Sequence, residues 1–111
     1  MNKTWVVTPV KIRAAVDRVV KVAHPRRVIL FGSAARGRKR MPNDVDLLVV
    51  SRHEVKSSRQ ESVRIRRALR DVSMPMDILV VSERRLRELA DQPGLVYRAA
   101  LKDGKVVYEA A

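Results

Sequence analysis

The chain has 111 residues and a mass of 12.6 kDa, so we expect residues 1–111 to form a single domain with no room for a second, substrate-binding one. Hydrophobic residues make up 46% of the chain, charged residues 32% and cysteine none, which excludes a disordered chain, disulfides and thiolate metal sites. The formal net charge of +12 favours a polyanionic partner, and nucleic acid, a nucleoside triphosphate and an acidic protein all meet that condition.

The first half of the chain predicts a helix and two strands. Its first eight residues contain no long apolar stretch, so we expect neither a signal peptide nor a membrane span, and we predict a cytoplasmic protein. Thr8 and the following proline, with apolar residues at helical spacing, predict a helix over 9–23. Apolar runs predict strands over 27–31 and 44–50, joined by a loop over 34–43. The second strand ends in four apolar residues, which is typical of a strand covered on both faces.

The second half predicts a crossover helix, a third strand and a closing unit. Apolar residues at helical spacing predict an amphipathic helix over 56–71, with its arginines on the solvated face. Residues 76–82 repeat the pattern of residues 45–51, with five of seven positions identical, and predict another buried strand. Two short helices and an edge strand follow, over 83–90, 95–102 and 105–108. These elements predict an α/β (α+β) fold with one small mixed sheet flanked by helices.

Three aspartates stand at the starts of two predicted strands. Asp44 and Asp46 follow Gly32-Ser33 after an interval of ten residues. Residues two apart in a strand point to the same face, about 7 Å apart, so these carboxylates form a pair. Asp77 holds the equivalent place in the next strand. Carboxylate oxygens suit Mg²⁺, and two such ions can clamp the attacking oxygen and the leaving pyrophosphate of a nucleotidyl transfer.

The Gly32-Ser33 turn predicts a phosphate-binding element. Glycine allows the backbone to approach phosphate oxygens closely, and backbone N–H groups and the Ser33 hydroxyl can donate hydrogen bonds to them. Arg36 can neutralise part of the triphosphate charge. The sequence therefore predicts a site for a nucleoside triphosphate with its metal ions.

This pattern resembles the DNA polymerase beta-type nucleotidyltransferase superfamily, whose signature is a hydrophobic residue, Gly-Ser, about ten residues and Asp-x-Asp. The chain is more closely similar to the minimal nucleotidyltransferases, the antitoxin partners of HEPN-domain toxins. The resemblance rests on Gly32–Gly37, on Asp44 and Asp46, on Asp77 and on the closing segment Gly104–Glu109. It extends over residues 10 to 109.

The resemblance implies a polymerase beta-like core and a role for each motif residue. Asp44, Asp46 and Asp77 would be catalytic residues and ligands of two Mg²⁺ ions, and Gly32 and Ser33 would bind ATP. Asp77 would also help to deprotonate the acceptor hydroxyl. AMP would pass from ATP to a tyrosine of a HEPN-like toxin, and the chain would act as a type VII-like antitoxin.

Two other functions fit the same sequence. A non-catalytic module could mask its toxin by contact and keep the carboxylates for nucleotide binding or stability. A basic protein of this charge could instead bind nucleic acid, although only the net charge points there. We expect no metal-binding role for His24 or His53, because neither has a partner at a ligand spacing.

Overall fold

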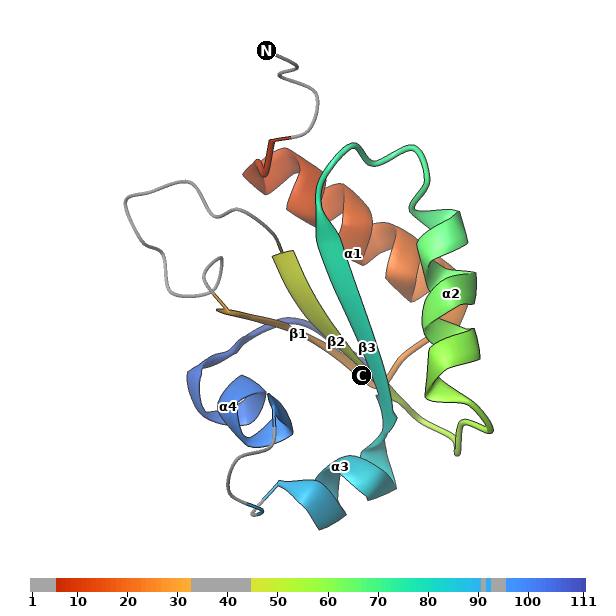
Figure 1. Ribbon diagram of the computed structural model, residues 1–111, viewed down its shortest axis with the longest axis vertical. Coiled ribbons are helices and arrows are strands. Elements are labelled where there is room, and N and C mark those ends of the chain that lie inside the picture. Colours follow the sequence, from red (N-terminus) through yellow and green to blue (C-terminus); the bar gives the residue numbers. More distant parts are fainter. Residues whose placement is uncertain (1–5, 33–44, 91, 93–95) are drawn as a thin grey trace.

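The computed structural model describes residues 6–32, 45–90, 92 and 96–111, and the elements follow the order αββαβααβ within them (Figure 1). The four helices are α1 (Pro9–Ala23), α2 (Ser58–Ala68), α3 (Glu83–Leu89) and α4 (Val96–Asp103). The four strands are β1 (Arg27–Phe31), β2 (Val45–Ser51), β3 (Met76–Ser82) and β4 (Lys105–Glu109). Each strand and helix predicted from the sequence is present, within a few residues of its expected ends. The predicted loop over 34–43 lies outside the described residues.

The four strands form one sheet in the order β3-β2-β1-β4. β2 and β3 are parallel, whereas β1 is antiparallel to both β2 and β4. The predicted mixed sheet is therefore confirmed, as is the position of β4 at an edge. β2 lies inside the sheet with side chains buried on both faces, which accounts for its continuous apolar run.

Helices cover both faces of the sheet (Figure 1). α1 and α2 pack on one face, where Val19 and Ile65 meet Leu47 and other inward residues of the strands. α3 and α4 pack on the opposite face, where Leu86 and Ala100 join a second cluster of buried residues. Consecutive residues of β2 alternate between the two clusters, as the pleat of a strand requires.

Side-chain caps set the beginnings of the two long helices. The Thr8 hydroxyl accepts the backbone N–H of Lys11 at the start of α1, and the Ser57 hydroxyl accepts that of Gln60 at the start of α2. The predicted helix over 56–71 is too long at both ends, because Ser57 is its cap and the chain leaves helical geometry at Leu69. Within the described part of the chain, no helix has the length and apolarity needed to cross a membrane.

Candidate functional site

Three segments meet at one end of the sheet. β1 is antiparallel to β2, and β2 is parallel to β3, so the last residues of β1 lie at the same end of the sheet as the first residues of β2 and β3. Phe31 is paired with Asp46, and the backbone N–H of Val45 donates to the Pro75 carbonyl at 3.0 Å. The glycine turn after β1 and the starts of β2 and β3 therefore share one place in the fold.

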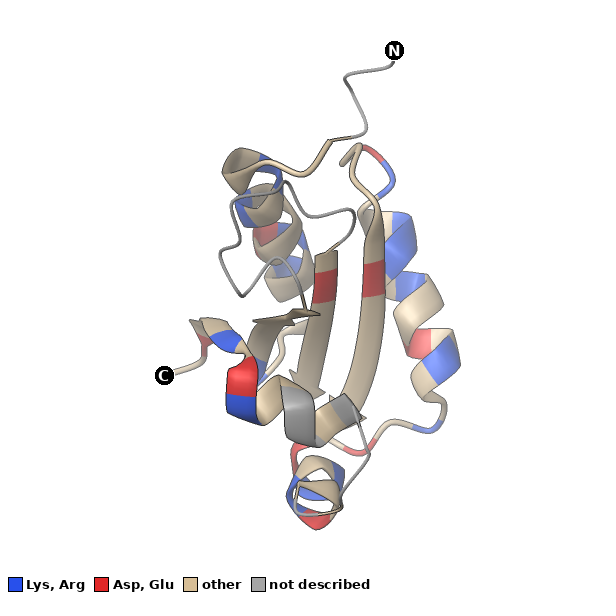
Figure 2. Cartoon of the chain, turned by 60° about the vertical axis from the view of Figure 1, so that its left-hand side comes forward, with Lys and Arg blue, Asp and Glu red and all other residues tan. Residues whose placement is uncertain are grey.

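Asp46 and Asp77 are direct neighbours in the parallel pair of β2 and β3. The residues two and four positions after each aspartate pack in the cluster beneath α3 and α4, so both aspartates lie on that face of the sheet. Adjacent strands lie about 4.8 Å apart, which brings the two side chains within reach of a shared cation. Figure 2 shows the acidic positions of β2 and β3 side by side.

Gly32 lies directly against the carboxylate of Asp46. Its φ is +77°, and a Cβ atom built on it would stand 2.4 Å from Oδ2 of Asp46. Any larger residue would therefore need a left-handed backbone and would also displace the carboxylate. The glycine that the sequence assigns to phosphate binding thus also makes room for the Asp46 side chain.

Asp77 forms an ion pair with an arginine of α2. Nη2 of Arg66 lies 3.2 Å from Oδ1 of Asp77, and the side chains are 51% and 62% exposed respectively. Arg66 reaches Asp77 across the β3 edge of the sheet, because α2 packs on the opposite face. The sequence prediction treated Arg66 as part of a solvated helix face; it is exposed, but its partner lies in the candidate site. No signal in the sequence marked it, since the ten residues between the two include a turn whose path only the fold determines.

The other predicted site residues cannot be placed. Ser33, Arg36 and Asp44 lie outside the described residues, so their predicted roles stay predictions. Among the residues that are described, no group of three or more acidic, histidine or cysteine side chains could hold a metal ion. Asp46 and Asp77 still fit a magnesium ion, because hard oxygen donors converge there and Mg²⁺ takes its remaining ligands from substrate phosphates and water.

Comparison with known proteins shows which sequences and folds the chain is similar to. The family model described as "Polymerase beta, Nucleotidyltransferase" matches residues 15–111. A crystal structure from Sulfolobus solfataricus, named "putative nucleotidyltransferase", has the same fold, with a TM-score of 0.58 and 22% sequence identity. The likeness covers 89% of this chain and 83% of the other. No curated protein matches the chain.

Proposed function

This chain belongs to the polymerase beta nucleotidyltransferase family, and from that premise we propose that it transfers a nucleotidyl group to a hydroxyl group on a partner protein. The observation that carries the proposal is the pairing of Asp46 with Asp77 beside Gly32. Two carboxylates and a glycine turn at one end of a sheet match what a triphosphate with its cations requires.

Different residues of the site would bind the triphosphate and position the acceptor. Gly32 leaves its backbone open to a phosphate group, and Ser33 and Arg36 add a hydroxyl donor and a positive charge from the segment that follows. Asp46, which lies against Gly32, would supply an oxygen ligand for a cation at the α-phosphate. Asp44, two residues earlier in the motif, would supply another. Asp77 accepts the proton of the acceptor hydroxyl or orients that hydroxyl for attack.

The transfer is an in-line displacement at the α-phosphorus. The acceptor oxygen forms a bond to that phosphorus as the bond to the bridging oxygen breaks, and pyrophosphate leaves with the electron pair. Bound Mg²⁺ would supply charge neutralisation for the leaving pyrophosphate and lower the pKa of the acceptor hydroxyl. Asp44, Asp46 and Asp77 are the residues that would hold it, and their negative charge is needed for that purpose.

The acceptor and the donor nucleotide are proposed from the resemblance to the minimal nucleotidyltransferases. By that resemblance the donor is ATP, the acceptor is a tyrosine of a HEPN-like toxin, and the modification inactivates the toxin. The chain would then be an antitoxin of the type VII-like class.

Transfer of label from ATP tests the proposal. The chain is incubated with Mg²⁺, ATP labelled at the α-phosphate, and the purified product of an adjacent toxin gene. We expect label on the toxin, and we expect Asp46→Asn or Asp77→Asn to reduce the rate at least about 10- to 100-fold, the loss typical of even outer-shell metal positions. Asp17→Asn, which removes an exposed carboxylate of α1, is the matched control and should label at the wild-type rate.

Two results would count against this function. Undiminished labelling by the Asp46→Asn, Asp77→Asn double variant would reject the assigned catalytic residues. If the double variant no longer labels the toxin but still neutralises it fully, protection comes from contact with the toxin and not from nucleotidyl transfer.

A further inference from the structure

The exposed side of α2 and the two segments that flank it carry cationic side chains. We call Lys56, Arg59, Arg66, Arg67 and Arg70 the α2 cationic stripe. Arg59, Arg66 and Arg67 belong to the helix and fall within an arc of roughly 100°, at about 100° per residue. Lys56 precedes the Ser57 cap, and Arg70 follows the Leu69 cap. Within the helix, Arg59 and Arg67 are about 12 Å apart along the axis, at about 1.5 Å per residue. The only carboxylate in this segment, Glu61, lies outside the arc and pairs with Arg64.

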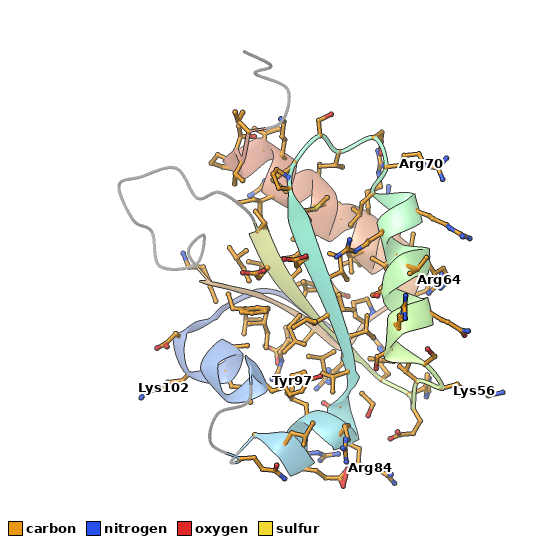
Figure 3. The ribbon with its side chains drawn as sticks, viewed as in Figure 1. Lys56, Arg64, Arg70, Arg84, Tyr97 and Lys102 are labelled. Carbon is orange, nitrogen blue, oxygen red and sulfur yellow. The ribbon has the colours of Figure 1, made fainter. Side chains whose placement is uncertain are left out.

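Most of the stripe is exposed and has no acidic partner. All five side chains are exposed, and Lys56 and Arg70 extend away from the sheet in Figure 3. Among the described residues, only Arg66 of the five forms an ion pair, the one with Asp77. Figure 2 shows the corresponding blue bands along α2. Keeping unpaired arginines adjacent on one helix face costs repulsion, which a bound polyanion would remove.

The composition of this face favours phosphate over a protein surface. Protein interfaces rely on aromatic and apolar anchors in their buried centre. Val63, 42% exposed, is the one large apolar side chain within the arc. No aromatic residue occurs between Phe31 and Tyr97 in the sequence. Interfaces with nucleic acid are more polar and much more positively charged than interfaces between proteins, and arginine matches phosphate in geometry.

We propose that the α2 cationic stripe binds the phosphate backbone of a double-stranded nucleic acid. Exposed cations on α2 and just beyond both of its ends can meet several phosphates of a duplex, whose charge density exceeds that of a single strand. Binding to single strands normally adds base stacking on aromatic side chains, and this face has none. The stripe contacts only the sugar-phosphate backbone of the duplex, so binding shows no preference for base sequence.

This activity is separate from the proposed transfer. The stripe lies on and beside α2, which packs on the face of the sheet opposite to Asp46, and the duplex site needs no metal ion. Arg66 is left out of the test because it contacts Asp77. The Asp46→Asn, Asp77→Asn double variant should therefore bind duplex at least as tightly as the unmodified chain, which keeps failure of the transfer proposal distinct from failure of this one.

Fluorescence anisotropy with a labelled 20-base-pair duplex of mixed sequence, between 50 and 200 mM NaCl, measures the binding. The test variant is Arg59→Gln, Arg67→Gln, Arg70→Gln. The control, Arg85→Gln, Arg87→Gln, Lys102→Gln, removes the same charge from exposed positions of α3 and α4 on the opposite face. We expect a wild-type Kd of about 10⁻⁶ to 10⁻⁴ M near physiological salt. The test variant should lower the slope of log K against log salt by about 2 to 3, since each lost phosphate contact removes about 0.9.

Three outcomes would overturn the proposal. An equal decrease of the salt slope in the test and control variants would show that binding depends on the net charge and not on the position of the cations at α2. Tighter binding of a 20-nucleotide single strand than of the duplex would reject the duplex as the partner. Displacement of the duplex by polyglutamate of the same charge, at the same concentration as by unlabelled duplex, would identify an acidic polypeptide as the occupant.

Discussion

Gly32 and Asp46 constrain each other, because the carboxylate occupies the space where a side chain at position 32 would begin. We expect Gly32→Ala to lower the free energy of unfolding by at least about 1–2 kcal/mol, the cost of a left-handed conformation for a residue with a Cβ atom. The displaced carboxylate should also weaken binding of Mn²⁺, used as a probe for Mg²⁺. Urea denaturation and calorimetric Mn²⁺ titration measure the two effects.

Gly104→Ala is the matched control for that experiment. A Cβ atom at position 104 would lie 2.1 Å from the Ala100 carbonyl oxygen and 2.7 Å from Cγ2 of Ile29, so this substitution also destabilises the fold, by about 1–3 kcal/mol. Position 104 lies before β4, outside the candidate site. Equal weakening of Mn²⁺ binding in both variants would show that Gly32 acts only through stability.

Arg66 competes with a cation for Asp77. Replacing the arginine by glutamine frees the carboxylate, so we expect Arg66→Gln to tighten Mn²⁺ binding. An exposed ion pair is worth about 0.2–1 kcal/mol, and the tightening should therefore reach at most about fivefold. Arg67→Gln removes the same charge one residue further on, at a position that forms no ion pair with Asp77 among the described residues. It should change the affinity for Mn²⁺ less. An equal effect of the two substitutions would mean that the Arg66 contact is not responsible.

At this scale the sequence predicted a carboxylate but not its counter-ion. Asp77 could be predicted as a neighbour of Asp46 because the two strands repeat one pattern, and the register confirms that neighbourhood. The pair with Arg66 depends on how α2 lies across the edge of β3, which no local pattern encodes. The close approach of Gly32 to Asp46 is likewise a product of strand pairing. The catalytic roles of these residues stay predictions.

The two helices on one face of the sheet are tied together by arginines. Arg18 of α1 pairs with Asp71 and donates to the Ala68 carbonyl at the end of α2. Arg64 of α2 pairs with Glu61 at 2.6 Å and donates to the carbonyl of Val22 in α1 at 3.3 Å. These contacts link the ends of α1 and α2 in addition to the packing of their apolar faces.

Acid should loosen this connection. Hydrogen bonds from Arg64 and Arg18 lower the pKa of Glu61 and of Asp71 below their ordinary values. A carboxyl with a lowered folded-state pKa adds stability above its unfolded pKa, about 4, and that stability is lost as the pH falls through the folded value. We expect Glu61→Gln to cost about 0.3–0.5 kcal/mol at pH 7 and nothing at the lowest pH at which the chain stays folded.

Urea denaturation at pH 7 and at steps below pH 4 measures the difference. Asp17→Asn is the control, since Asp17 forms no ion pair among the described residues. A cost of Glu61→Gln that stays constant across this range would contradict the assigned pair.

Elements with strong local signals were predicted well, and their ends less so. Thr8, the proline that follows it and the apolar spacing predicted a helix over 9–23, and α1 has these bounds. His24 caps the end of the helix in a left-handed conformation, with φ of 46°. This conformation is unusual for a residue other than glycine, and the sequence did not predict it. α2 ends at Ala68 although apolar spacing continues to Leu69 and Val72, because those two side chains are buried from a turn and not from a helix.

The whole molecule carries an excess of twelve positive charges, and this excess opposes a compact state. Added salt screens the repulsion, over a distance of about 10 Å at 0.1 M. We expect the melting temperature to rise by several degrees between 10 and 300 mM NaCl, since about 1 kcal/mol shifts the melting temperature of a domain of this size by roughly 4 °C. A thermal melt followed by circular dichroism measures it. A melting temperature that falls or stays constant would contradict net repulsion.

The order of the strands could not be predicted at this scale. Four apolar residues in a row predicted that β2 is buried on both faces, and this is confirmed. An apolar run likewise predicts that β1 is buried. That run does not indicate that β1 lies between β2 and β4, or that β1 is antiparallel to both. Pairing joins residues far apart in the chain, and a buried apolar strand fits any interior position equally well.

The candidate site lies at one end of the sheet, and some connecting segments lie at the other. In most open α/β sheets ligands bind at the carboxyl ends of the strands. Here Asp46 and Asp77 stand at the amino ends of β2 and β3, so the connection from β2 to α2, residues 52–57, leaves the sheet at the opposite end. Its exposed residues, such as Arg52 and His53, give a place to attach a fluorophore or insert a tag without entering the site. In this fold, then, the safe position for a probe is where an engineer accustomed to α/β enzymes would look for the active site.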